Sequence, residues 1–183
     1  MKKANIYLAE GFEEIEALTV VDVLRRAGVD INTVAVTTAK EVKGAHNITV
    51  IADKTFDEID NYSADMLILP GGMPGTTNLE KHEGLRAFIK EFYQNEKYIA
   101  AICAAPIILG KMGLLENSMA TCYPGFEKDL KGAIHAEEPV IRHKNIITSK
   151  GPGTAILFAL DLVEILVGKE KAEQIKDQMI VQR

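Results

Sequence analysis

Short apolar runs alternate with longer segments of helical periodicity along the chain. Short apolar runs at residues 4–9, 66–69 and 98–102 predict strands, and the continuous run 66–69 is typical of a strand buried on both faces of a sheet. Residues 31–37 alternate loosely between apolar and polar side chains and predict another strand. Residues 48–51 are rich in β-branched side chains and follow turn-forming residues, which predicts a hairpin-like excursion.

Apolar side chains spaced three or four residues apart mark the helices. Two such stripes comprise Ala17, Val21 and Leu24, and Leu85, Phe88, Ile89 and Phe92. Residues 105–112 predict a short helix, and residues 154–167 predict a long helix that is largely buried. Residues 169–183 predict a charged final helix and tail.

Strands that alternate with helices predict an α/β fold with a mostly parallel central sheet and helices on both faces. A hairpin is expected at residues 140–148. The 183 residues are close to one nominal domain of ~150 residues, so we expect a single domain over residues 1–183. Ligands of such sheets bind at the carboxyl ends of the strands, here residues 10–16, residues 70–75 and Cys103.

Composition and charge narrow the classes of function. Hydrophobic residues make up 47% of the chain and charged residues 26%, which indicates a globular protein. The formal net charge is −5 and the sequence has no dense run of Lys and Arg, so we expect no sequence-specific nucleic-acid binding. The apolar stretch near the N-terminus is too short for a signal peptide, and no stretch approaches the ~18 apolar residues of a membrane span. These features predict a cytoplasmic protein without a membrane partner.

The two cysteines, Cys103 and Cys122, form no CxxC pair, so the sequence indicates neither a disulfide framework nor a zinc knuckle. We expect no metal and no cofactor. Cys103 lies between a predicted strand and a predicted helix, where the helix dipole and free N–H groups favour the thiolate. The sequence thus predicts a lowered pKa for Cys103. The alternative is a buried, inert thiol, which is the commoner fate of a free cysteine.

Small residues adjoin Cys103, including Ala104, as a tight strand-to-helix turn requires. This layout is similar to a nucleophile elbow, although the glycines of the serine version are absent. Gly71 and Gly72 end the preceding strand, and their N–H groups could serve as an oxyanion hole. The alternative for this glycine pair is a simple turn that ends the strand.

Glu13, Glu14 and Glu16 follow the first strand. A carboxyl group pointed at a thiolate has its pKa raised by the like charge and by burial, and can then donate a hydrogen bond. Acids at a helix start also compensate the helix dipole, and we favour that role for Glu13 and Glu14. Glu16 lies next to the first apolar helical positions and is the candidate partner of Cys103.

Four separated motifs carry a family resemblance from about residue 3 to about residue 180. They are GFEEIEALTVVDVLRRAG, LILPGGMPG, AAICAAP and TSKGPGTA. Together they resemble the ThiJ/PfpI superfamily, and within it the branch of the Parkinsonism-associated protein deglycase and bacterial YajL. The resemblance implies a flavodoxin-like three-layer sandwich, a homodimer, a reactive Cys103 and a protonated Glu16. It also implies that Gly71 and Gly72 lie near the sulfur, and it matches the family's Gly-Pro-Gly-Thr segment to residues 151–154, which include Gly153 and Thr154.

The resemblance implies two classes of function. The first is a cysteine-dependent glyoxalase or deglycase that acts in a stress response on 2-oxoaldehydes such as methylglyoxal, or on glycated proteins or nucleotides. In this reading the Cys103 thiolate adds to the aldehyde, Glu16 transfers protons, and the N–H groups of Gly72 and Ala104 hold the oxyanion. The alternative is an oxidant sensor or redox-regulated chaperone that uses Cys103 without turnover.

Departures from the family pattern limit these expectations. Ala104 stands where the protease-like branch has a histidine, so a Cys-His peptidase is disfavoured. Tyr123 replaces a histidine and, with an ordinary pKa near ~10, is a poor base at neutral pH. His46 replaces an arginine of the pocket, which puts the family's anion preference in doubt. A resolving role for Cys122 is disfavoured.

Overall fold

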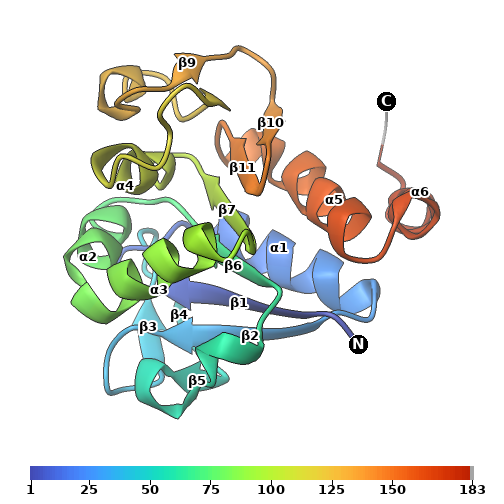
Figure 1. Cartoon of the computed structure of the whole chain (residues 1–183). Coiled ribbons are helices and arrows are strands. Elements are labelled where there is room, and N and C mark those ends of the chain that lie inside the picture. The colour runs from blue at the N-terminus through green and yellow to red at the C-terminus, as the bar shows by residue number, and fades with distance from the viewer. Residues whose placement is uncertain (182–183) are drawn as a thin grey trace.

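A seven-stranded sheet forms the centre of the computed structural model, which describes residues 1–181 (Figure 1). Its strands are β1 (Lys3–Leu8), β2 (Asp30–Ala35), β5 (Lys54–Thr55), β6 (Met66–Leu69), β7 (Tyr98–Ile102), β10 (Val140–His143) and β11 (Ile146–Ser149). Their order is β10-β11-β7-β6-β1-β2-β5, and each neighbouring pair is parallel except β10 and β11. The mostly parallel sheet expected from the sequence is confirmed.

Helices cover both faces of this sheet (Figure 1). One face carries α1 (Glu14–Arg26), α5 (Ala155–Leu166) and α6 (Lys169–Gln178), and the other carries α2 (Gly75–Lys81), α3 (Glu83–Gln94) and α4 (Pro106–Lys111). Side chains of β1 alternate between the two cores, since Ile6 packs in the first and Tyr7 in the second. The expected three-layer sandwich is therefore confirmed.

Several shorter elements lie outside the main sheet. The expected excursion is an antiparallel hairpin of β3 (Glu41–Lys43) and β4 (Thr49–Ile51), and β8 (Met119–Ala120) pairs with β9 (Ile134–His135). The sequence analysis did not predict α2, because the segment GTTNLEK has a single large apolar residue and no stripe. Residues 182–183 of the expected C-terminal tail lie outside the described residues.

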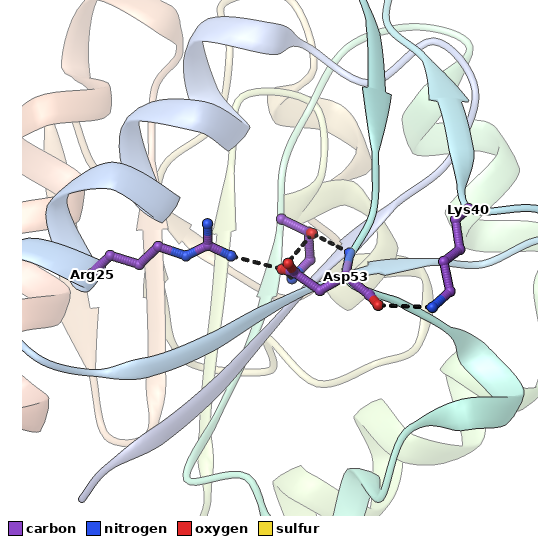
Figure 2. Close-up of polar contacts among 4 residues, drawn as sticks. Arg25, Lys40 and Asp53 are labelled. Atoms are coloured by element: carbon purple, nitrogen blue, oxygen red, sulfur yellow. Dashed lines mark hydrogen bonds and ion pairs between the residues drawn. The ribbon is translucent and has the colours of Figure 1, made fainter.

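A polar cluster around Asp53 ties the end of the β3–β4 hairpin to α1 and β2 (Figure 2). Oδ2 of Asp53 accepts hydrogen bonds from Arg25 Nη2 at 2.7 Å and from the Thr33 hydroxyl at 2.7 Å. Lys40 donates to the Asp53 carbonyl oxygen at 3.0 Å. Because the Arg25 and Asp53 side chains are about half exposed, this cluster stabilises little, by ~1 kcal/mol or less, but it fixes the base of the hairpin.

Residues 1–181 contain no helix with both the length and the apolar character needed to cross a lipid bilayer.

Candidate functional site

Cys103 lies on the turn that links β7 to α4. Its backbone has a φ of +66°, a left-handed conformation that costs a non-glycine residue ~1–2 kcal/mol. Two backbone hydrogen bonds hold it there: the Cys103 N–H donates to the Ser149 carbonyl at 2.9 Å, and the Cys103 carbonyl accepts from the Tyr123 N–H at 2.8 Å. The side chain is largely buried, with 8% of the residue exposed. The fold thus holds the sulfur in a single, partly strained orientation.

The Glu16 carboxyl group is fully buried next to this sulfur. Its Oε2 accepts a hydrogen bond from the Gly71 N–H at 2.8 Å, while Oε1 has no nitrogen or oxygen partner among the described residues. A buried carboxylate oxygen without a donor is costly, whereas a protonated oxygen can donate toward the neighbouring sulfur. The geometry therefore favours the protonated form of Glu16.

The pKa of Glu16 follows from this environment. Burial, with a smaller contribution from the charge of Glu13, raises it from 4.5 to about 7 against the opposing hydrogen bonds from Cys103 and Gly71. A carboxyl group with a pKa near neutrality can both accept and donate a proton under physiological conditions.

The predicted low pKa of Cys103 is wrong for the free protein with Glu16 ionised. Burial and then the charge of Glu16 raise the pKa of the thiol to about 12, although hydrogen bonds from the Gly72 and Ala104 N–H groups oppose this rise. The sequence argument relied on a helix dipole directly behind the sulfur. In the structure α4 begins at Pro106 and has only six residues, so its dipole is displaced and weak.

Gly71 lies where no side chain fits. A Cβ atom at this position would lie 2.5 Å from Cys103 Cβ and 2.8 Å from Glu16 Oε2. Gly72 has a φ of +88°, and its N–H, like that of Ala104, points at the sulfur. The glycine pair is thus more than a turn that ends β6, because it admits the sulfur and the carboxyl group and also supplies N–H donors.

The remaining candidates lie around this centre with less direct contacts. The Tyr123 ring is exposed and packs over Gly151, while its N–H holds Cys103. The Thr154 hydroxyl bonds the Ser149 hydroxyl at 2.7 Å and the Gly151 carbonyl at 2.9 Å, so it fixes the turn behind Cys103. Gly153 is exposed on that turn, with open space around it.

His46, in the loop between β3 and β4, contacts the start of α1. Its N–H donates to Glu14 Oε1 at 2.7 Å, and its Nδ1 lies 2.8 Å from Glu14 Oε2. The hydrogen bond to Glu14 raises the pKa of His46. Glu13 caps α1, because its Oε2 accepts from the Glu16 N–H at 2.8 Å. His46 therefore contacts the glutamates at the start of α1.

Known proteins match both the sequence and the fold. The model of the DJ-1/PfpI family matches residues 2–165. The chain belongs to the DJ-1/PfpI family. Protein DJ-1 homolog B of Arabidopsis thaliana is 38% identical over 98% of this chain and 42% of its own length. The chain also spans 47% of Arabidopsis DJ-1 homolog A, so it covers about half of these two relatives.

Other members of the DJ-1/PfpI family match nearly end to end. The protein named glutathione-independent glyoxalase DJ-1 of Schizosaccharomyces pombe is 33% identical over 93% of this chain and 94% of its own length. The structure of oxidized Toxoplasma gondii DJ-1 superposes with a TM-score of 0.96 at 36% identity and covers 100% of both chains. The resemblance inferred from the four motifs is therefore confirmed.

Cys122 differs from Cys103 in position and surroundings. It packs in the core on the α3 and α4 side of the sheet, whereas Cys103 packs in the α1 and α5 core. Burial raises the pKa of the Cys122 thiol to about 11, as do the charges of Glu127 and Asp129. Both cysteines are free. A resolving role for Cys122 is thus unsupported by its location.

The sequence analysis missed the burial of Glu13 and Glu14, which it treated as ordinary acids at a helix start. Both are buried in the structure, and each contacts the His46 side chain. Residues 43–47 of the hairpin fold back onto α1. Their polar, turn-forming side chains gave no indication of this contact in the sequence.

The raised pKa of Glu16 predicts a pH-dependent stability difference between the protein and its Glu16→Gln variant. The unfolded chain releases the Glu16 proton near pH 4.5, whereas the folded chain keeps it to about pH 7. The folded state therefore binds more protons in this interval, and stability falls as the pH rises through it. The free energy of unfolding of the variant, relative to that of the parent, should therefore rise by up to ~3 kcal/mol between pH 4.5 and pH 8.

Urea unfolding of both proteins at several pH values measures this difference. Glu137→Gln is the control, because Glu137 is exposed and its hydrogen bond with Lys150 lowers its pKa. The difference in free energy of unfolding between Glu137→Gln and the parent should therefore not change with pH across the same interval. If the stability difference between Glu16→Gln and the parent also does not change with pH, the pKa of Glu16 is not raised in the folded protein.

Proposed function

We propose that this chain is a cysteine-dependent, glutathione-independent glyoxalase and deglycase that acts on 2-oxoaldehydes such as methylglyoxal and on early glycation adducts. The observation that carries the proposal is the buried pair of Cys103 and Glu16, held together by Gly71. The printed name of the fission yeast relative, a glutathione-independent glyoxalase, supports the same activity. A role in the response to carbonyl stress follows from these substrates.

The reaction begins with proton transfer within the pair. As the sulfur attacks the aldehyde carbon, the thiol proton passes to ionised Glu16, whose pKa of about 7 suits this exchange. This transfer also removes the negative charge that raises the thiol pKa. The N–H groups of Gly72 and Ala104 stabilise the negative oxygen that forms on the former aldehyde carbon. Glu16 then returns the proton to this oxygen and leaves a hemithioacetal.

The second stage moves a proton within the substrate. The Glu16 carboxylate removes the hydrogen of the former aldehyde carbon and passes it to the neighbouring carbonyl oxygen, which gives an enediol. Glu16 then takes the hydroxyl proton of the former aldehyde carbon and delivers it to the adjacent carbon. The product is a thioester of a 2-hydroxy acid on Cys103. Water hydrolyses this thioester, releases the acid and restores the thiol. The substrate and one water give one 2-hydroxy acid, so no external oxidant, reductant or cofactor is needed.

Oxidant sensing is a second candidate function for the same cysteine. The N–H groups of Gly72 and Ala104 and the protonated Glu16 can donate hydrogen bonds to sulfinate oxygens as well as to a substrate oxyanion. The similarity to oxidized Toxoplasma DJ-1 favours this candidate. Chaperone activity would then follow from the modified surface without turnover.

A homodimer is proposed as the assembly. Large apolar side chains are exposed on α1, at Ile15 and Leu18, and on the adjoining hairpin, at Ile48 and Ile51. The hairpin is fixed to α1 through His46 and Glu14, so both elements can form one surface. Contiguous exposed apolar side chains are typical of protein interfaces.

Substitutions in the catalytic pair should abolish turnover. Cys103→Ala removes the nucleophile, so lactate formation from methylglyoxal without glutathione or metal should be lost. Glu16→Gln removes the proton acceptor and should lower kcat by at least ~100-fold. Cys122→Ala is the control and should keep the parent rate, because this thiol lies in the opposite core. Robust turnover by Cys103→Ala would overturn the enzymatic proposal.

Mild peroxide treatment tests the second candidate function, oxidant sensing by Cys103. Mass spectrometry should find two added oxygens on Cys103 and none on Cys122, because Cys122 is almost fully buried and lies in the opposite core. In Glu16→Gln an amide N–H, which is a weaker donor than a carboxyl O–H, replaces the carboxyl group, so Cys103 should pass more readily to the sulfonic state. Preferential oxidation of Cys122 would contradict the sensing role.

The proposed dimer predicts a molar mass of twice 20.1 kDa in light scattering after gel filtration. Ile15→Lys places a charge on the apolar face of α1 and should shift the protein toward the monomer. Ile134→Lys is the matched control, because Ile134 is also exposed but lies on β9, and it should leave the mass unchanged. A monomer mass for the parent would contradict the dimer, and a dimer mass kept by Ile15→Lys would show that the dimer does not use this face.

A further inference from the structure

A second cluster of chemically active side chains lies beside the catalytic pair and takes no part in the proposed reaction. Glu13 and Glu14 come from the start of α1, and His46 comes from the loop of the β3–β4 hairpin. Ligand atoms of the three side chains lie within 4.8 Å of one another. Two segments separated by about thirty residues in sequence therefore present one histidine nitrogen and two carboxylates at a single point.

Backbone hydrogen bonds fix the two segments relative to each other. The Gly11 N–H donates to the Lys43 carbonyl at 2.8 Å, and the Ala45 N–H donates to the Phe12 carbonyl at 2.8 Å. Gly44 packs so closely against the Glu14 carboxylate that any side chain there would overlap it. The cluster is thus held by the fold and does not depend on a chance meeting of mobile surface groups.

The charges of this cluster are unbalanced. Only 9% of the Glu13 side chain and 5% of the Glu14 side chain are exposed, whereas 69% of the His46 side chain is exposed. Within residues 1–181, the salt bridges of these two glutamates go to His46 alone. Two buried carboxylates therefore share one solvent-exposed imidazole, which balances at most one of the two charges. Hydrogen bonds from the His46 N–H to Glu14 and from the Glu16 N–H to Glu13 offset part of the cost of burial, and a bound cation would balance the remaining charge.

The distances suit a transition-metal ion. Ligand atoms bound tetrahedrally at ~2.0–2.1 Å lie about 3.3–3.4 Å from one another. The distance from His46 Nδ1 is 2.8 Å to Glu14 Oε2 and 3.7 Å to Glu13 Oε1, values on either side of that separation. Oε2 of Glu13 accepts the Glu16 N–H, and Oε1 faces His46 Nδ1.

We propose that Glu13, Glu14 and His46 bind a divalent transition-metal ion of the zinc type. The ligands are Glu13 Oε1, Glu14 Oε2 and His46 Nδ1, and the exposed side of the imidazole leaves a further position to solvent. The ion takes the place of the Nδ1 proton, which leaves to water. A histidine nitrogen among the ligands favours zinc or copper over magnesium or calcium, which prefer oxygen ligands alone. The spacing of cysteines in the sequence gave no sign of such a site, because it uses neither cysteine.

Calorimetric titration of the untagged full chain with zinc chloride tests the proposal. The Cys103→Ala variant serves as the parent, so that the reactive thiol cannot bind the metal. We expect one zinc ion per chain, and a loss of affinity of at least ~10-fold in both His46→Ala and Glu13→Gln. His135→Ala is the matched control, because His135 lies 3.7 Å from a single exposed carboxylate, Glu137, and lacks a second one. Its affinity for zinc should equal that of the parent.

NMR provides a readout that does not depend on affinity. Zinc should shift the imidazole signals of His46 and leave those of His135 and His143 in place. Circular dichroism of each variant without metal checks that it is folded. Unchanged binding in His46→Ala, no zinc binding by the parent, or equal responses to magnesium and zinc would each overturn the proposal. These outcomes are independent of lactate formation, so the failure of this site and the failure of the proposed enzyme are distinguishable.

Discussion

The site depends on one close approach, that of the Gly71 backbone to Cys103 and Glu16. The Gly71 N–H holds the Glu16 carboxyl group at 2.8 Å, and the absent side chain leaves space for the sulfur. This contact joins α1, the end of β6 and the turn after β7, which are adjacent because β1, β6 and β7 are neighbours in a parallel sheet. Any residue larger than glycine here would separate the two reactive groups, so the topology and the chemistry impose the same requirement.

The electrostatics of the pair follow from that proximity. Burial and the charge of Glu13 raise the pKa of Glu16, and the charge of Glu16 in turn raises the pKa of Cys103. Two buried acids in contact cannot both ionise without a large cost, so the pair holds at most one negative charge near neutral pH. The N–H groups of Gly72 and Ala104 bias that charge toward the sulfur, while the hydrogen bond from Gly71 biases it toward the carboxylate.

The sequence predicted the fold well wherever burial leaves a periodic pattern. The apolar runs at residues 66–69 and 98–102 are strands of the sheet centre, covered on both faces, so their composition alone identified them. The helix α2 and the position of His46 were not predictable, because neither depends on an apolar stripe. Cys103 and Glu16 were identified as neighbours, but the direction of the thiol pKa shift was wrong. That direction depends on burial and on a charge contributed by a distant segment, which no local pattern records.

The two backbone hydrogen bonds of Cys103 have a consequence for biosynthesis. Its partners, the Tyr123 N–H and the Ser149 carbonyl, belong to segments that leave the ribosome well after the cysteine itself. Until β11 takes its place beside β7, nothing holds the left-handed turn, and the thiol belongs to an ordinary unstructured segment. A nascent chain therefore carries Cys103 for many residues before the turn acquires its geometry, and the proposed site is complete only once Tyr123 and Ser149 have been made.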